Sequence, residues 1–243
     1  MRKTEIVSEI PEVVYVHGGG DVDEAVRLGA AWLREYPGDK LVLVPQMQVY
    51  RNNALLPELT VGTKVAKPRT VWRVNWRGGP VLAPWPTNEV LSEISDHLSD
   101  RVTAVCLLEW GEDEYLRAWV RAHNGTNLLT GDAAPGEEEL LSPVVTAAME
   151  DLSRLVNHAN GLVQQEDKKY AIQTLQRLVS AGYTFDVDNL VAWALAHGFT
   201  GSEVTRLRDY ATRVLQGHRF RLTRPSVFVD NIVEIWEQEA RQR

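Results

Sequence analysis

The sequence predicts an α/β domain, with a mostly parallel, Rossmann-like sheet and helices on both faces, followed by an all-α domain. Short, nearly continuous apolar runs at residues 13–16, 41–44 and 102–108 are typical of strands buried on both faces of a parallel sheet. Amphipathic stretches of helical period lie between these runs. Strand signals disappear in the second half, which predicts a separate helical domain.

The predicted boundaries follow from changes in composition along the chain. We expect the α/β domain over residues 1–132 and a polar linker, acidic and containing Pro and Gly, over 133–141. The helical domain then covers residues 142–243, where Ser142 and Pro143 form a typical helix start. Its helices are expected at about 143–158, 166–180, 187–197, 202–216 and 226–240.

The first domain is predicted to alternate strands and helices. A helix over 21–35 begins at Asp21, a good N-cap residue, and further helices are expected at 87–98 and 112–122. Residues 46–68 read as an irregular connection. Residues 70–76 alternate in polarity, which predicts a strand with Trp72 and Trp76 on its core face, and 80–85 and 127–129 are expected to be extended.

Composition excludes several classes of protein. The chain has 243 residues, a net charge of −7 and one cysteine, Cys106, so an internal disulfide is impossible and a reducing, cytoplasmic location is expected. The apolar runs are too short to cross a bilayer, so no membrane partner is expected. No apolar segment follows Arg2 and Lys3, so no secretory signal is expected.

One segment of the acidic first half is strongly basic. Residues 64–77 carry Lys64, Lys67, Arg69, Arg73 and Arg77 with no acidic residue. Cations interleaved with tryptophans suit single-stranded nucleic acid, so Arg69, Arg73 and Arg77 are candidate phosphate contacts. The alternative is an amphipathic strand whose tryptophans lie in the core, and the alternation favours it.

The run VVYVHGGGD at residues 13–21 is predicted to be a strand, a tight turn and a helix start. Ligands of parallel sheets bind at the carboxyl ends of the strands. The candidate ligand-binding residues are therefore His17, Gly18, Gly19, Gly20 and Asp21, together with Glu109, which follows the 102–108 strand at the same sheet edge. A structural turn capped by Asp21 is the alternative.

The same run resembles the HGGG oxyanion strand of the lipase and esterase branch of the α/β-hydrolases. That resemblance implies a serine nucleophile in a Gly-x-Ser-x-Gly elbow. None of the nine serines has glycines at that spacing, so we reject acyl transfer. A phosphate cradle is disfavoured by the carboxylates of Asp21, Asp23 and Glu24, unless a metal held by His17, Asp21 or Asp23 intervenes.

Residues 188–215 resemble a helix-turn-helix unit. Ala194, Gly198, Phe199 and Val204 fit its packing positions, whereas His197 stands where an apolar residue is usual. The resemblance implies phosphate contacts from the arginines of the second helix and its tail, Arg206, Arg208, Arg213 and Arg219. A helical hairpin without a DNA role is the alternative.

The sequence favours a nucleic-acid-associated or regulatory binding protein. In this hypothesis the helical domain contacts phosphates, and the α/β domain holds a small-molecule ligand or a partner. The first alternative is an enzyme, metal-assisted or otherwise ligand-transforming, at the sheet edge, with His17, Asp21, Asp23 and Glu109 as its polar groups. The second is a protein–protein interaction module that docks a partner or a second copy of the chain. No motif specifies a cofactor or a metal site.

Overall fold

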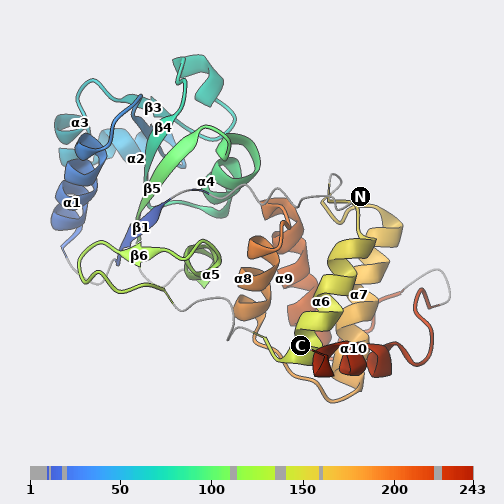
Figure 1. The fold of residues 1–243 in the computed structure, drawn as a ribbon. Helices are drawn as coiled ribbons and strands as arrows, with labels where there is room; N and C mark the ends of the chain where they lie inside the picture. Colours follow the sequence, from blue (N-terminus) through green and yellow to red (C-terminus); the bar gives the residue numbers. More distant parts are fainter. Residues whose placement is uncertain are drawn as a thin grey trace, which may run out of the picture. The chain divides into compact units, whose positions relative to one another are not determined.

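The computed structural model describes residues 10, 12–17, 21–109, 114–134, 141–158, 161–221 and 226–242. The chain folds into two compact units, Met1–Gly136 and Glu137–Arg243 (Figure 1). Ala133 and Ala134 belong to the first unit, because Ala133 forms a β-bridge with Thr126 and the Ala134 N–H donates to the Gly125 carbonyl at 2.7 Å. The rest of the predicted linker, residues 135–140, lies outside the described residues.

The described residues of the first unit form a six-stranded, all-parallel sheet with the order β3-β2-β4-β5-β1-β6. Its strands are β1 (Val13–Val16), β2 (Leu41–Leu43), β3 (Lys64–Ala66), β4 (Gly79–Pro84), β5 (Val102–Leu108) and β6 (Thr126–Asn127). The predicted α/β class is confirmed. The order differs from the 3-2-1-4-5-6 order of dinucleotide-binding sheets, because β1 lies between β5 and β6.

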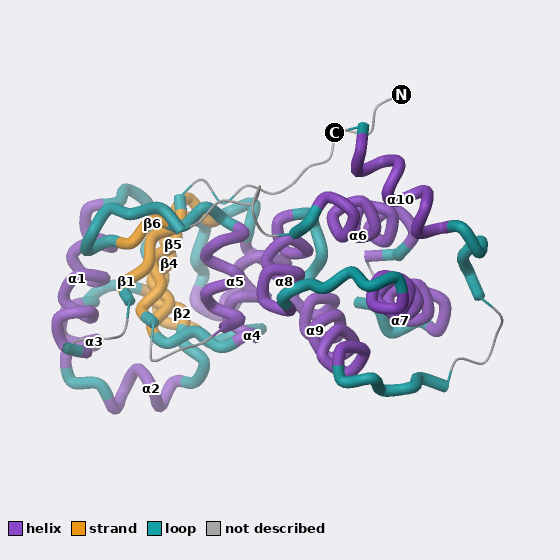
Figure 2. Tube along the Cα trace, turned by 90° about the horizontal axis from the view of Figure 1, so that it is seen from below, coloured by secondary structure: helices purple, strands orange, loops and turns teal. Residues whose placement is uncertain are grey.

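Helices cover both faces of this sheet (Figure 2). One face carries α1 (Val22–Glu35), α2 (Met47–Asn52) and α3 (Leu55–Leu59), and the other carries α4 (Asn88–Ser92), the π-helical turn η2 (Glu93–Leu98) and α5 (Glu114–Ala122). On the first face, Val26 and Leu33 of α1 share a buried cluster with Leu82 and Leu108 of the sheet. On the second, Trp119 of α5 is fully buried.

The strand order creates two openings at the carboxyl edge of the sheet. The chain leaves β2 toward one face and leaves the neighbouring strand β4 toward the other. The same divergence occurs between β1, which leads to α1, and its neighbour β5, which leads to α5. Adjacent strands whose connections diverge in this way leave a crevice in which ligands of open α/β sheets bind.

The predicted strand over residues 70–76 is wrong. These residues contain a 3₁₀ helix, η1 (Val71–Val74), flanked by Arg69 and Asn75 with φ of 62° and 52°. Left-handed residues cannot continue a strand, so the alternation of polarity does not place alternate side chains on one face. Trp76 is buried as expected, but Trp72 is 74% exposed.

The connection over residues 46–68 is also more regular than predicted, since it contains α2, α3 and β3. The N-cap of α1 is as predicted, because the Asp21 carboxylate accepts the Asp23 N–H at 2.9 Å.

The described residues of the second unit form helices and no strand, which supports the predicted all-α domain. The helices are α6 (Pro143–Leu155), α7 (Gln165–Ser180), α8 (Val187–Ala196), α9 (Gly201–Leu215) and α10 (Ile232–Arg241). The last begins six residues later than predicted. Helix α9 begins with a capping box between Thr200 and Glu203. Within the described ranges, none of the helices combines the length and the apolar character that a membrane span needs.

Candidate functional site

The crevice between β1 and β5 brings His17 and Glu109 together. The register pairs Val16 with Leu108, and the Glu109 N–H donates to the Val16 carbonyl at 3.0 Å, so the next residues of both strands emerge side by side. His17 Nδ1 lies 2.5 Å from Glu109 Oε2. The two side chains therefore meet at the sheet edge, where the parallel arrangement predicts them.

Burial of Glu109 gives this pair its chemistry. The Glu109 side chain is 3% exposed, and its second oxygen accepts from Arg117 Nε of α5 at 3.4 Å. The His17 side chain is 49% exposed. A hydrogen donated from Nδ1 to the carboxylate leaves Nε2 of the neutral ring as the proton acceptor. The arrangement can therefore accept a proton from a ligand, as the His–carboxylate pairs of hydrolases do.

The other residues predicted at this sheet edge add no further contact to the His17–Glu109 pair among the described residues. Gly18, Gly19 and Gly20 lie outside the described residues. Asp21 serves as the helix cap described above. Among the residues that the structure describes, no three His, Cys, Asp or Glu side chains gather as metal ligands.

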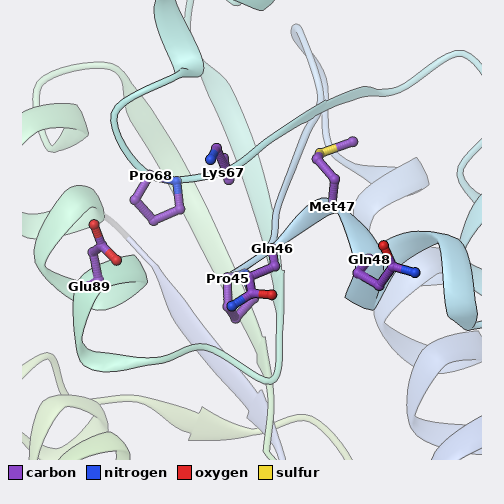
Figure 3. A pocket seen from close by; sticks show the side chains of 7 residues that line it. All are labelled: Pro45, Gln46, Met47, Gln48, Lys67, Pro68 and Glu89. Atoms are coloured by element: carbon purple, nitrogen blue, oxygen red, sulfur yellow. The ribbon is translucent and has the colours of Figure 1, made fainter.

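The crevice between β2 and β4 contains a pocket of about 460 Å³, shown in Figure 3. Its wall is made by the segments that follow β2 and β3 and by the first turn of α4: Pro45, Gln46, Met47, Gln48, Lys67, Pro68 and Glu89. The lining of the pocket thus combines polar groups, namely two amides, an ammonium and a carboxylate, with the apolar side chains of one methionine and two prolines. Sequence reasoning missed this site, although it marked the 46–68 connection as unusually long.

The basic segment adjoins this pocket. Arg69 Nε lies 3.5 Å from Oε1 of Glu89, and the Arg69 carbonyl accepts the Trp72 indole N–H at 3.1 Å. The Arg73 guanidinium lies 4.9 Å from the centroid of the Trp72 ring, and Lys67 lines the pocket itself. The exposed basic and aromatic side chains of this segment, hereafter the Trp72 surface, are Lys67, Arg69, Trp72, Arg73 and Arg77.

Lys64 does not belong to the Trp72 surface. Its ammonium pairs with the Asp39 carboxylate and also donates to the Asn75 carbonyl at 2.6 Å. The hydrogen bond from Lys64 lowers the pKa of Asp39, so the pair stays ionised over a wide pH range. Lys64 therefore fixes the loop that carries Trp72 and the three arginines.

Three of the four predicted arginines of the helical unit contact groups of their own unit. Arg206 donates to the Gly161 carbonyl at 2.6 Å and to the Ser202 carbonyl at 3.0 Å. Arg208 lies 2.5 Å from the Asp188 carboxylate of α8. These contacts fasten α9 to its neighbours. Arg213, in the last turn of α9, lies 3.4 Å from the Asp209 carboxylate and 2.7 Å from His218 Nε2, and Arg219 follows the helix.

Two further histidines, His123 and His197, lie at helix ends. His123 and His197 each stack on the tryptophan one turn earlier, Trp119 and Trp193, with ring centroids 3.9 and 3.6 Å apart. In each case Nδ1 lies 2.8 Å from the carbonyl of that tryptophan. Burial lowers the pKa of His123 to about 4, so it stays neutral. The unusual His197 of the turn after α8 is thus a helix-ending residue.

A buried ionic contact that the sequence did not reveal lies at the start of α9. Glu203 is fully buried and accepts hydrogen bonds from the Thr200 N–H at 2.7 Å and from His158 Nδ1 at 3.1 Å. His158 Nε2 lies 3.1 Å from the Ser153 carbonyl, so both ring nitrogens face acceptors. The hydrogen bond to Glu203 raises the pKa of His158. The Thr-x-x-Glu spacing was the signal available in the sequence.

Comparison with known proteins bears on the second unit. A family model described as a domain of unknown function (DUF1889) matches residues 141–237, which is less than half of the chain. No curated protein matches the chain, and no solved structure matches it. The matched segment coincides with the helical unit, from just before α6 into α10.

Proposed function

We propose that the protein is a nucleic-acid-associated binding protein whose α/β unit holds a single strand at the Trp72 surface and the adjoining pocket. The observation that carries the proposal is the exposure of Trp72, which is 74% accessible among cations. A tryptophan in the core, as the strand prediction required, could not stack on a base. The exposed indole removes that objection.

The chemistry of the surface matches the two parts of a nucleotide. An exposed indole stacks on any base, and loss of such a stack costs about 1–3 kcal/mol. Lys67, Arg73 and Arg77 can contact neighbouring phosphates. Gln46 and Gln48 of the pocket can donate to and accept from base edges.

The charge distribution supports the same location. Outside residues 64–77, the first 140 residues carry nine basic and 21 acidic side chains, a balance of −12. A polyanion is repelled by most of this unit and attracted to one segment of it. A basic segment on an acidic body therefore directs the ligand as well as binding it.

The test is fluorescence anisotropy of a labelled single-stranded oligonucleotide, titrated with the full chain at several salt concentrations. Three phosphate contacts predict a slope of log K against log salt of about −2. Trp72→Ala is expected to weaken binding about 5- to 150-fold. Arg73→Gln should weaken binding and flatten the slope by about 0.7.

The matched control is Arg27→Gln, which removes an exposed arginine from α1 of the same unit. It is expected to bind like the unsubstituted protein. Absence of binding at low salt, or equal weakening by Trp72→Ala and Arg27→Gln, would refute the proposal.

Duplex binding by α9, which the helix-turn-helix resemblance implies, has weaker support. Arg206 and Arg208 already bind groups of their own unit. The same titration with a duplex oligonucleotide tests this role. Tighter binding of the duplex than of the single strand, lost in Arg213→Gln, would establish it.

A second candidate function is proton transfer at the β1–β5 crevice. It is favoured by the 2.5 Å contact between His17 and the buried carboxylate of Glu109, itself held by Arg117. The expected result is a His17 ring protonated at Nδ1 in ¹⁵N NMR spectra, and rapid acylation of its Nε2 by diethyl pyrocarbonate. Glu109→Gln should slow that acylation. The other tautomer, or an unchanged rate, would refute this role.

A further inference from the structure

A second pocket, of about 510 Å³, lies in the helical unit and is lined by two arginines. The last two turns of α7 supply Gln176, Arg177 and Ser180, the segment after α9 supplies His218 and Arg219, and Ser226 closes the pocket. No carboxylate is present among the described residues that line it. In a chain of net charge −7, such a wall selects anions.

The wall on the α7 side is held in place by hydrogen bonds. Arg177 Nη2 donates to Ser226 Oγ at 3.3 Å. The Val227 N–H donates to Gln173 Oε1 at 2.8 Å, which ties the segment of Ser226 to α7. Arg177 and Ser226 are far apart in the sequence but are held together by these hydrogen bonds. The side chains therefore lose little conformational entropy when a ligand binds.

The wall on the α9 side is equally fixed. Arg213 Nη2 lies 2.7 Å from His218 Nε2, and the Arg213 guanidinium lies 4.6 Å from the centroid of the Phe220 ring. A guanidinium can only donate, so His218 Nε2 accepts, and the ring hydrogen of His218 is on Nδ1. His218 is therefore a hydrogen-bond donor at its other nitrogen.

The carboxyl ends of α7 and α9 do not oppose an anion strongly. Their last carbonyls accept backbone N–H groups: Gly182 to Val179 at 3.1 Å and His218 to Arg213 at 2.9 Å. Such caps satisfy the carbonyls that would otherwise face the ligand. The Arg177 and Arg219 guanidiniums oppose what remains of the negative ends of the two helix dipoles.

From these observations we infer that the pocket binds a phosphate ester. Two guanidiniums, an imidazole N–H and hydroxyl groups supply the several donors that a phosphate accepts. The volume lies in the range of small-molecule sites, about 300–1,000 Å³, so the pocket can hold a ligand larger than inorganic phosphate. The phosphate belongs to a free nucleotide or to the terminal phosphate of a strand.

Isothermal titration of the full chain tests the inference with four probes: adenosine monophosphate, adenosine, and a short single strand with and without a 5′-phosphate. Each phosphorylated probe is compared with its unphosphorylated partner. Binding of the monophosphate but not of adenosine identifies a free nucleotide as the source. A 5′-phosphate effect on the strand alone identifies a strand end.

In both cases Arg177→Gln and Arg219→Gln are expected to weaken the phosphate-dependent binding tenfold or more. Arg154→Gln, which removes an arginine that is 61% exposed on α6, is the matched control and should leave it unchanged. If Arg177→Gln fails to fold, Arg219→Gln still tests the inference, because Arg219 is exposed and its substitution should leave the fold intact.

Two results would overturn the inference: no phosphate dependence with either pair of probes, or binding that both variants leave intact. Neither result bears on the Trp72 surface. That site is tested by Trp72→Ala with unphosphorylated strands, and the two proposals therefore fail separately.

Discussion

The helical unit is expected to lose stability as the pH rises through the folded pKa of His158, because the fold favours the imidazolium form of this residue. Both of its ring nitrogens face acceptors, the Glu203 carboxylate at 3.1 Å and the Ser153 carbonyl at 3.1 Å. Only the doubly protonated ring can donate to both. The hydrogen bond to Glu203 is the largest cause of the raised pKa of His158, and the charge of Asp167 adds to it.

The sign and size of the effect follow from proton linkage. The unfolded histidine has a pKa of about 6.5, and the folded one titrates at higher pH. The folded state therefore holds the extra proton, and its contribution is complete below pH of about 6.5 and disappears as the pH passes the folded pKa. The slope cannot exceed about 1.4 kcal/mol per pH unit.

The total change is expected to be modest. A hydrogen bond between charged groups contributes about 1.5–3 kcal/mol. The His158 side chain is 33% exposed, so solvent screening reduces this to about 1–2 kcal/mol. Removal of the carboxylate costs more, because Glu203 is fully buried and fixes the start of α9: Glu203→Gln should cost about 3 kcal/mol.

Urea unfolding monitored by far-ultraviolet circular dichroism, repeated from pH 5.5 to 9, measures this contribution. The difference between the unsubstituted protein and His158→Gln isolates the one histidine, since the other titrating groups are common to both. The expected difference is largest at low pH and falls to a constant value at high pH, where the neutral ring still packs against Phe199. A His158→Gln protein with the same pH dependence as the unsubstituted protein would refute the reasoning.

Three further substitutions or reactions test the packing of the α/β unit. Gly29→Ala adds a Cβ that lies 2.8 and 2.9 Å from the methyl groups of two buried leucines. The overpacking costs about 1–3 kcal/mol and should outweigh the gain in helix propensity of about 1 kcal/mol, so chemical denaturation should show a less stable protein. A more stable protein would contradict this. Gly79→Ala should lower the thermal midpoint sharply, because φ is +145° and the added Cβ would lie 2.5 Å from the Asp39 carbonyl; an unchanged midpoint would show that the backbone relaxes freely. Burial raises the pKa of the Cys106 thiol, so iodoacetamide should modify it only in denaturant, and rapid reaction of the native protein would place it at the surface.

The strands and helices with strong local signals were predictable from the sequence. The apolar runs at residues 13–16, 41–44 and 102–108 form the parallel strands β1, β2 and β5. The parallel pairing of β1 with β5 places His17 beside Glu109. The position of His17 and Glu109 at the sheet edge could be predicted from the topology. The contact of Arg117 with Glu109 could not. It reaches Glu109 from α5, and no pattern in the sequence relates the two residues.

The basic segment shows where periodicity misleads. Tryptophans at alternate positions favoured a strand, but two left-handed residues, Arg69 and Asn75, close a tight loop around η1. The hydrogen bonds that fix this loop come from Lys64 and Asp39, and only Lys64 lies in the segment itself. The exposure of Trp72 was thus decided by a contact distant in sequence.

Charge counting misleads in the helical unit for a related reason. Four arginines in and after α9 suggested one phosphate-binding face. The fold pairs Arg208 with Asp188, uses Arg206 to cap a turn at Gly161, and places Arg219 beside Arg177 of α7. The sequence shows how many arginines are present. The tertiary contacts determine which of them are available to bind a ligand.

The position of β1 between β5 and β6 also constrains the order of folding. Val13 pairs with Val105, so the first strand to be synthesised has no neighbour until β5 has been made. Strands β2, β3 and β4 can pair, and α1 can pack against β4 and α3, before β1 has a neighbouring strand. Contacts between residues so far apart slow folding, and the second unit has a comparable long-range contact between α6 and α10. The last step in the folding of the α/β unit should therefore be the insertion of β1 beside β5.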